Sequence, residues 1–271
     1  MMKMSCTSSM VPGSTLTEKA ENLKKWGFDG MGVFVEYKDW SEELEKEILS
    51  LEENTGIKPC EFCFSDDIYG HLMDENETIR NAARKMYKEA AIVCGKIGGA
   101  ITELEYQYGA QDPLPLFDPY AKMNPEQEKA FIEMYTEICD AVKDADAYVL
   151  IEPINRYEAP FLNNVDHCLE VVKKMNHDRA GLLLDMFHLS IEEADIPAKI
   201  RESGSYVKYV HLGDNNRLMP GYGSTNWKAI VKALKDIGFD GYMSLECSLT
   251  GDPEKTLPEA AAFMKKLAEE A

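Results

Sequence analysis

Short apolar runs alternate with amphipathic, helix-like segments along all 271 residues of the chain. This alternation is typical of a parallel sheet whose strands are joined by crossover helices. We predict eight strands, at residues 3–10, 30–35, 57–65, 100–105, 147–152, 180–185, 207–211 and 242–246. Barrels of eight strands and eight helices typically need about 250 residues. The sequence therefore predicts an α/β fold in which residues 1–271 form a single (β/α)8 TIM barrel.

The segments between the predicted strands have the features of helices. We predict helices at residues 16–26, 41–54, 76–97, 125–145, 165–175, 196–203, 227–237 and 257–269. Asn76, Asn124 and Asn164 stand at the start of three of them, where an asparagine side chain can cap the first turn. The segment Lys25-Trp-Gly-Phe-Asp-Gly30 before the second strand matches Asp236-Ile-Gly-Phe-Asp-Gly241 before the eighth. This partial repeat supports a fold built from similar units.

The charge and cysteine content limit the partners of the chain. Lys and Arg total 29 against 48 Asp and Glu, which gives a formal net charge of −19. This excess argues against a nucleic-acid or anionic-membrane partner. The first ten residues lack the apolar stretch of a secretory signal, and no segment approaches the roughly 20 apolar residues of a membrane span. With seven cysteines suited to reduced thiols, we expect a soluble, cytoplasmic protein.

Cys60 and Cys63 form a C-x-x-C pair inside a segment that alternates like a strand. The spacing alone is a weak signal for a redox or zinc site, and no second pair accompanies it. We therefore predict that both are buried strand residues.

Polar side chains close the last four predicted strands: Glu152, Asp185, His211 and Glu246. The carboxyl ends of the strands carry the active site in α/β barrels. Any one of these residues alone could instead cap a helix or form a structural hydrogen bond. Four titratable groups at one barrel mouth, however, would repel or desolvate one another without a cation. Three carboxylates and an imidazole indicate a mostly oxygen site for a divalent cation.

Three further polar residues follow these strand ends closely and would overhang the same mouth: Glu158, His188 and Arg217. Their side chains can accept from and donate to sugar hydroxyls and a carbonyl oxygen. The alternatives are a loop ion pair for Glu158 and Arg156, and support of the metal ligands for His188. We favour substrate contact, and we expect an enzyme that acts on a small hydroxylated carbonyl compound.

One long loop, residues 106–120, interrupts the alternation and is rich in proline and aromatic residues. Loops of this length are usually functional or disordered, and the aromatic residues favour function. We interpret it as a lid or a contact surface, with an inert surface insertion as the alternative.

The segments 152–158, 184–193 and 211–221 resemble the ketose 3-epimerases, typified by D-tagatose and D-psicose 3-epimerase, in the xylose-isomerase-like TIM barrel superfamily. The resemblance is strong from about residue 150 to residue 246 and weak before that. It implies that Glu152, Asp185, His211 and Glu246 bind the metal, usually manganese, cobalt or magnesium. It also implies that the two glutamates are the acid/base pair, and that the three overhanging residues contact the sugar.

The chemistry of such a reaction agrees with these residue types. A C–H beside a carbonyl is a very weak acid, so a metal that binds the neighbouring oxygens would stabilise the enediolate. Glu152 would remove the proton and Glu246 would return it on the opposite face. We expect a divalent-metal-dependent sugar isomerase or epimerase with Mn²⁺ as cofactor, or Co²⁺ or Mg²⁺, and a small carbohydrate as substrate. Relatives are commonly dimers or tetramers, which predicts a homo-oligomer.

The first predicted strand departs from the family, because Cys6-Thr-Ser-Ser-Met10 is small and polar where the epimerases carry aromatic residues. An alternative relative is the large subunit of C-glycoside deglycosidases, lyases that use the same proton abstraction on a 3-oxo-glucoside to eliminate an aromatic aglycone. That interpretation implies a hetero-complex with a small β-rich subunit. A metal-dependent endonuclease is disfavoured by the five histidines and the acidic charge. A non-catalytic sugar-binding module would leave the clustered acids unexplained.

Overall fold

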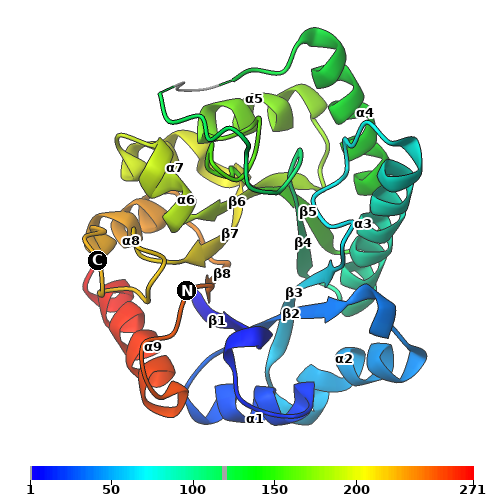
Figure 1. Ribbon diagram of the computed structural model, residues 1–271. Helices are drawn as coiled ribbons and strands as arrows, with labels where there is room; N and C mark the ends of the chain where they lie inside the picture. Colours follow the sequence, from blue (N-terminus) through cyan, green and yellow to red (C-terminus); the bar gives the residue numbers. More distant parts are fainter. Residues whose placement is uncertain (1, 118–120) are drawn as a thin grey trace.

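A computed structural model of the chain, described for residues 2–117 and 121–271, is a closed barrel of eight parallel strands in sequence order (Figure 1). The strands are β1 (Lys3–Thr7), β2 (Gly30–Glu36), β3 (Lys58–Ser65), β4 (Ala100–Leu104), β5 (Ala147–Ile151), β6 (Ala180–Asp185), β7 (Val207–Leu212) and β8 (Tyr242–Leu245). The barrel closes where β1 pairs in parallel with β8, with Met4 opposite Met243. The predicted single (β/α)8 architecture is confirmed.

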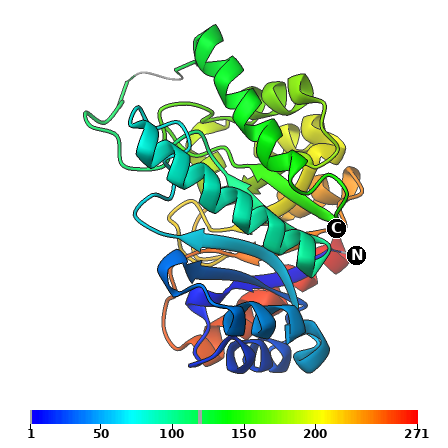
Figure 2. The same ribbon diagram turned by 90° about the vertical axis from the view of Figure 1, so that its right-hand side faces the viewer.

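Helices surround the barrel, and Figure 2 shows α3 and α4 running along its outside. They are α1 (Leu16–Lys25), α2 (Glu42–Thr55), α3 (Glu77–Ile97), α4 (Pro125–Asp140), α5 (Val165–Met175), α6 (Met186–Glu192), α7 (Ile196–Ser203), α8 (Trp227–Asp236) and α9 (Pro253–Glu270). Short 3-10 turns lie at Ser8–Met10, Tyr37–Asp39 and Gly204–Tyr206. None of the helices in the described ranges is long and apolar enough to cross a membrane.

The three predicted asparagine caps are confirmed. The side chains of Asn76, Asn124 and Asn164 each accept a hydrogen bond from a backbone N–H in the first turn of the helix that follows. At α4 the cap is reciprocal, because the side chain of Gln127 accepts from the backbone N–H of Asn124 at 2.9 Å. Each such cap contributes about 1 kcal/mol. The helix starts are therefore set by local sequence.

Three boundaries differ from the prediction by three residues or more. Helix α4 ends at Asp140 instead of residue 145, because residues 141–145 form turns. The first strand ends at Thr7 instead of residue 10, because residues Ser8–Met10 turn into a 3-10 helix in which Val11 N–H bonds to Ser8 O. The last helix begins at Pro253 instead of residue 257, since Asp252 caps it and a proline is tolerated in the first turn.

Helix α6 was not predicted, because seven residues directly after a strand are too few to show a helical period. Asp185 ends β6 and also caps α6, accepting a hydrogen bond from Phe187 N–H at 2.8 Å. The other end of α6 is held by Glu192, whose Oε2 lies 2.6 Å from Arg156 Nη2 in the loop after β5. Arg156 thus forms an ion pair with α6.

An apolar layer fills the barrel on the side of the strands' amino ends. It consists of Cys60, Ile101, Leu150, Leu183 and Tyr209, which come from β3 to β7. Cys63 is also buried, so both cysteines of the C-x-x-C pair are buried strand residues as predicted. Burial raises the pKa of Cys60 to about 12, so this thiol stays protonated. Nearer the carboxyl ends of the strands, charged side chains face the interior instead.

Candidate functional site

The four predicted ligands converge at the carboxyl ends of the strands. Asp185 ends β6 and His211 lies near the end of β7, while Glu152 and Glu246 directly follow β5 and β8. His211 Nδ1 lies 3.3 Å from Glu246 Oε2 and 3.8 Å from Glu152 Oε1. Donor atoms of Asp185, His211 and Glu246 all lie within 4.8 Å of one another. The four predicted ligands therefore come together in space, as their positions at the strand ends suggested.

Two of these donor atoms have no hydrogen-bond partner in the described part of the chain. They are Glu152 Oε1 and His211 Nδ1, and both are buried. A buried polar atom left unpaired costs about 1–3 kcal/mol, so such atoms call for a partner. A carboxylate oxygen and an imidazole nitrogen lone pair are both metal-binding atoms. The residues present therefore fit a divalent cation.

Glu61 on β3 supports His211 from the other side of the ring. Its Oε1 lies 2.9 Å from His211 Nε2, and neither side chain is exposed. The Tyr209 hydroxyl donates to Glu61 Oε2 at 3.4 Å. Glu61 faces Nε2, so Nδ1 is the nitrogen that faces the acidic cluster. Burial acts to lower the pKa of His211, but Glu246 and Glu61 raise it well above its usual value, so a bound cation would take the place of a proton on Nδ1. Gly32 on β2 makes room, because a Cβ there would lie 2.3 Å from Glu61 Oε2.

Arg217, predicted to contact substrate, lies against two of the predicted ligands. Its guanidinium bonds to Asp185 and, at 2.6 Å, to Glu246 Oε2. The guanidinium also lies 4.7 Å from the centroid of the Phe187 ring. Burial acts to raise the pKa of Asp185, but Arg217 and the two nearby histidines lower it below its usual value. Asp185 is thereby kept ionised, as a metal ligand must be.

The loop that carries Arg217 is held by Asp214. Arg217 adopts a left-handed backbone conformation with φ of 60°, and its N–H donates to Asp214 O at 2.8 Å. The carboxylate of Asp214 accepts from Trp227 Nε1 at 2.9 Å and from Gly221 N–H at 3.0 Å. Hydrogen bonds within the loop between β7 and α8, and to the first residue of α8, therefore fix the loop conformation that places the guanidinium.

His188 reaches the site from α6. Its Nδ1 accepts from Asn155 Nδ2 at 2.7 Å, and the same amide donates to Glu158 Oε1 at 2.8 Å. His188 Nε2 then carries the proton and lies 3.7 Å from Asp185 Oδ2 and 4.0 Å from Glu152 Oε1. Glu158 is therefore linked to His188 through the side-chain amide of Asn155. Asn155 is fully buried, and the sequence analysis did not predict it.

A cavity of about 160 Å³ opens above these groups. It is lined by Phe34, Phe64, Ser65, Tyr69, Glu103, Glu105, Tyr108, Glu152, Ile154, His188, Arg217 and Glu246. Glu158 is not among the lining residues. A larger hollow of about 360 Å³ lies at the opposite end of the barrel, between Lys3, Tyr148 and Lys208, and none of the predicted site residues lines it. Glu152, His188, Arg217 and Glu246 of the predicted site line the smaller cavity.

The loop at residues 106–120 borders this cavity through Tyr108, whose side chain is partly exposed. The N–H of Gly109 donates to Glu158 O at 2.8 Å, so the loop rests on the segment after β5. Burial raises the pKa of Tyr108 to about 12. Residues 118–120 of this loop lie outside the described residues.

Three acidic residues of the site were missed: Glu61, Glu103 and Glu105. All three are buried, on β3, on β4 and directly after β4. A signal was available at β4, because Ile101, Glu103 and Glu105 occupy alternate positions and so share one face of the strand. Burial raises the pKa of Glu105 to about 8 and also raises the pKa of Glu152.

A family model described as "Xylose isomerase-like TIM barrel" matches residues 20–267. The chain is 34% identical over 110 residues to a D-psicose 3-epimerase of Enterocloster bolteae, covering 41% of this chain and 36% of that protein. It is 26% identical over 229 residues to a probable ketose 3-epimerase of Synechocystis sp., covering 83% of this chain and 76% of that one. These matches confirm the resemblance on which the ketose 3-epimerase interpretation was based.

One solved structure illustrates the shared fold. The crystal structure of 3-keto-D-glucoside 4-epimerase from E. coli has a TM-score of 0.84 and 20% identity, covering 98% of this chain and 100% of that one. At this level of identity the likeness shows the fold alone. The chain matches little more than a third of the length of two D-psicose 3-epimerases, at 36% and 39%.

Proposed function

Since the chain belongs to the xylose isomerase-like TIM barrel family, we propose that it is a divalent-metal-dependent sugar epimerase of the ketose 3-epimerase type. The observation that carries this proposal is the convergence of Glu152, Asp185, His211 and Glu246, with two donor atoms buried and unpaired beside a cavity. Relatives named as D-psicose and ketose 3-epimerases support the reaction class.

In the proposed site these four residues hold one divalent cation, with Mn²⁺ as our first choice and Co²⁺ or Mg²⁺ as alternatives. A bound divalent cation polarises the oxygens of a carbonyl and of the hydroxyl on the neighbouring carbon, which makes the C–H of that neighbouring carbon more acidic. The ligand set, three carboxylates and one imidazole, is of the kind that such cations accept. Glu61 would keep His211 in the binding tautomer.

Glu152 and Glu246 are the proposed acid/base pair. They follow β5 and β8, which lie three strands apart in the closed barrel, and both line the cavity. A sugar carbon held between them would lose its proton to Glu152 and receive one from Glu246 on the other face, which inverts that carbon. Burial raises the pKa of Glu152 in the metal-free protein, whereas a bound cation would favour the ionised carboxylate that can accept the proton.

The remaining predicted residues would orient the sugar. His188 presents Nε2–H to the cavity because Asn155 occupies its other nitrogen, so it can donate to a sugar oxygen. Arg217 can donate to a substrate oxygen from the same rim. Glu158 supports this arrangement through Asn155.

The test is incubation with Mn²⁺ and a panel of ketoses and 3-oxo-glucosides in deuterated water. We expect deuterium at the carbon beside the carbonyl, together with the epimeric ketose. Exchange with none of these compounds would contradict the proposal. Release of an aromatic aglycone from a 3-oxo C-glucoside, with copurification of a small second polypeptide, would instead favour the lyase. The small polar side chains at Cys6–Met10 are the observation that keeps that alternative in the panel.

A further inference from the structure

Two buried glutamates at the end of β4 face the cavity and have no role in the proposed reaction. Glu103 and Glu105 are 4% and 2% exposed, and both line the cavity. Each has one oxygen fixed by a phenol, since Tyr69 donates to Glu103 Oε1 at 2.8 Å and Tyr87 donates to Glu105 Oε1 at 2.7 Å. The rings of these tyrosines stack with their centroids 5.5 Å apart. The two pairs form one rigid unit beside the predicted metal ligands.

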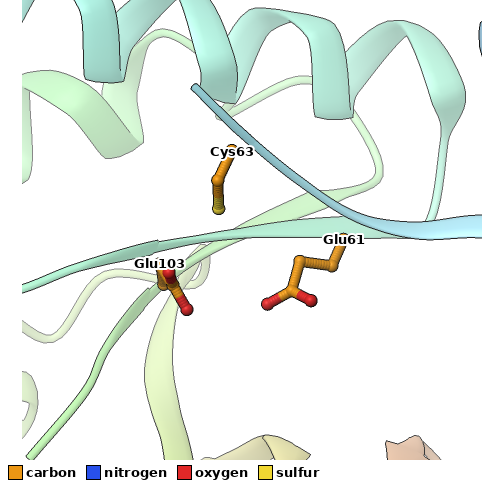
Figure 3. A group of neighbouring side chains, drawn as sticks. All are labelled: Glu61, Cys63 and Glu103. Atoms are coloured by element: carbon orange, nitrogen blue, oxygen red, sulfur yellow. The ribbon is translucent and has the colours of Figure 1, made fainter. Parts of the chain in front are cut away.

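The second oxygen of each carboxylate has no partner in the described part of the chain. These atoms are Glu103 Oε2 and Glu105 Oε2, and both are buried. Figure 3 shows the carboxylate of Glu103 directed toward the same space as that of Glu61. A buried carboxylate oxygen accepts hydrogen bonds and is costly when it receives none. Two acceptors at a cavity wall therefore call for donors from whatever occupies the cavity.

We propose that Glu103 and Glu105 form a hydroxyl-binding subsite that receives the part of a neutral, polyhydroxylated sugar lying away from the reacting carbon. This inference rests on the proposed function for the identity of the ligand as a sugar. Each unpaired Oε2 would form a hydrogen bond with one sugar hydroxyl, which can donate to an ionised carboxylate or accept from a protonated carboxyl. Neither side chain offers a positive charge to a phosphate or carboxylate group, whether or not it is ionised, so the subsite suits an uncharged sugar or glycoside.

A second metal ion is a weaker explanation of the same atoms. Glu61, Cys63 and Glu103 have donor atoms within 4.8 Å of one another, and so do Glu103, Glu152 and His211, of which the last two are already assigned to the first cation. The carboxylate of Glu61, however, already accepts from His211 and Tyr209. The Cys63 thiol lies 3.6 Å from Thr102 Oγ1, and burial raises its pKa well above the usual value. Two of the three donors are therefore engaged, whereas a hydroxyl needs only the free oxygen of Glu103.

The tyrosine anchors make the subsite preorganised. Tyr87 is itself fixed, because its oxygen accepts from Gly70 N–H at 3.0 Å. Tyr69 packs edge-on against Tyr108 of the cavity rim, with ring centroids 6.0 Å apart. Acceptors held in place before a ligand arrives lose little conformational entropy on binding. The subsite should therefore discriminate by hydroxyl position.

The experiment uses calorimetric titration of the Mn²⁺-loaded protein with a ketohexose, the matching sugar alcohol, and analogues that each lack one hydroxyl. Wild type is compared with Glu105→Leu and Glu103→Leu, which remove the acceptors, and with the milder Glu105→Gln and Glu103→Gln in case the leucine variants unfold. Glu53→Gln, at an exposed position on α2, is the control. Metal content and deuterium exchange are measured on each protein.

We expect wild type to bind the parent sugar about tenfold or more tightly than one deoxy analogue, a preference of the size expected when a buried polar group loses its hydrogen-bond partner. That preference should vanish in the variant whose carboxylate accepted the missing hydroxyl, and Glu53→Gln should retain it. If wild type and all variants showed the same preference for the parent sugar over each deoxy analogue, the inference would be overturned. A second bound Mn²⁺ that is lost in Glu103→Gln would also overturn it.

The two proposals fail separately. Sugar binding with the expected loss of discrimination, but without deuterium exchange, would support the subsite and contradict the epimerase. Exchange with unchanged discrimination in all four variants would support the epimerase and contradict the subsite. Absence of any sugar binding to wild type would contradict both.

Discussion

Glu61 Oε1 lies 2.9 Å from His211 Nε2, and both side chains are completely buried. The carboxylate comes from β3 and the imidazole from β7, so this contact spans the inside of the barrel. It fixes the plane of the imidazole ring and leaves Nδ1 as the atom that faces Glu152 and Glu246. A contact of this kind orients a ligand before any metal arrives.

Replacing Glu61 should weaken metal binding without removing a ligand. For Glu61→Ala we expect Mn²⁺ affinity to fall about 10–100-fold, because His211 loses the partner that fixes its ring and tautomer. Calorimetry gives the affinity, and nitrogen NMR of the imidazole reports the tautomer. The exposed Glu53→Gln variant is the control. An unchanged dissociation constant, with Nδ1 still unprotonated, would show that Glu61 has no such role.

Gly32 should tolerate no side chain. A Cβ at this position would lie 2.3 Å from Glu61 Oε2, so Gly32→Ala must displace the carboxylate that supports His211. We expect a loss of about 1–3 kcal/mol in unfolding free energy, as for other overpacked cores. Mn²⁺ affinity should fall as well. Denaturant unfolding and metal titration measure the two effects, and wild-type values of both would refute the steric argument.

The proposed acid/base pair makes the most direct kinetic prediction. Glu152→Gln and Glu246→Gln should each lower kcat by about 10²–10⁴-fold, the usual contribution of a positioned acid or base. Circular dichroism should show an intact barrel in both. Full activity in either variant would exclude the two-base scheme, and loss of exchange in Glu152→Gln alone would identify the residue that removes the proton.

The fold could be predicted because each barrel unit has a local signal. Strand runs, turns and helix caps such as Asn124 depend on neighbours in the sequence, and the structure confirms them. The four strand-end residues were found for the same reason, since the carboxyl ends of parallel strands must meet at one face. Helix α6 was missed because it is too short to show a period.

The supporting residues could not be predicted in the same way. Glu61 lies within a strand that reads as an ordinary alternating segment, and its partner is 150 positions away. Asn155 lies inside a recognised segment, but its bond to His188 depends on α6, which the sequence did not reveal. Arg217 was expected over the cavity, and its contacts with Asp185 and Glu246 depend on a loop fixed by Asp214. Contacts between distant segments require the packed barrel.

Chelation should destabilise the protein. Bound metal would pair the orphaned atoms of Glu152 and His211 and offset the repulsion among the carboxylates. At a free Mn²⁺ concentration of 100 times the dissociation constant, the expected gain is about 2.7 kcal/mol. Thermal unfolding with Mn²⁺, and again with excess EDTA, measures the difference. Identical melting temperatures would argue against a metal site in the folded protein.

Glu105 should make the metal-free protein less stable as the pH rises. Burial raises the pKa of its carboxyl from 4.5 to about 8, so the folded protein holds a proton that the unfolded chain releases above about pH 4.5. The folded state therefore loses stability between about pH 5 and pH 8, by about 1.4 kcal/mol for each pKa unit of the shift at most. Glu105→Gln has no such proton to lose. In EDTA its free energy of unfolding should lie close to that of wild type near pH 5 and exceed it near pH 8.5, measured by urea unfolding at both values. Parallel pH profiles for the two proteins would show that Glu105 ionises in the folded state as it does in the unfolded chain.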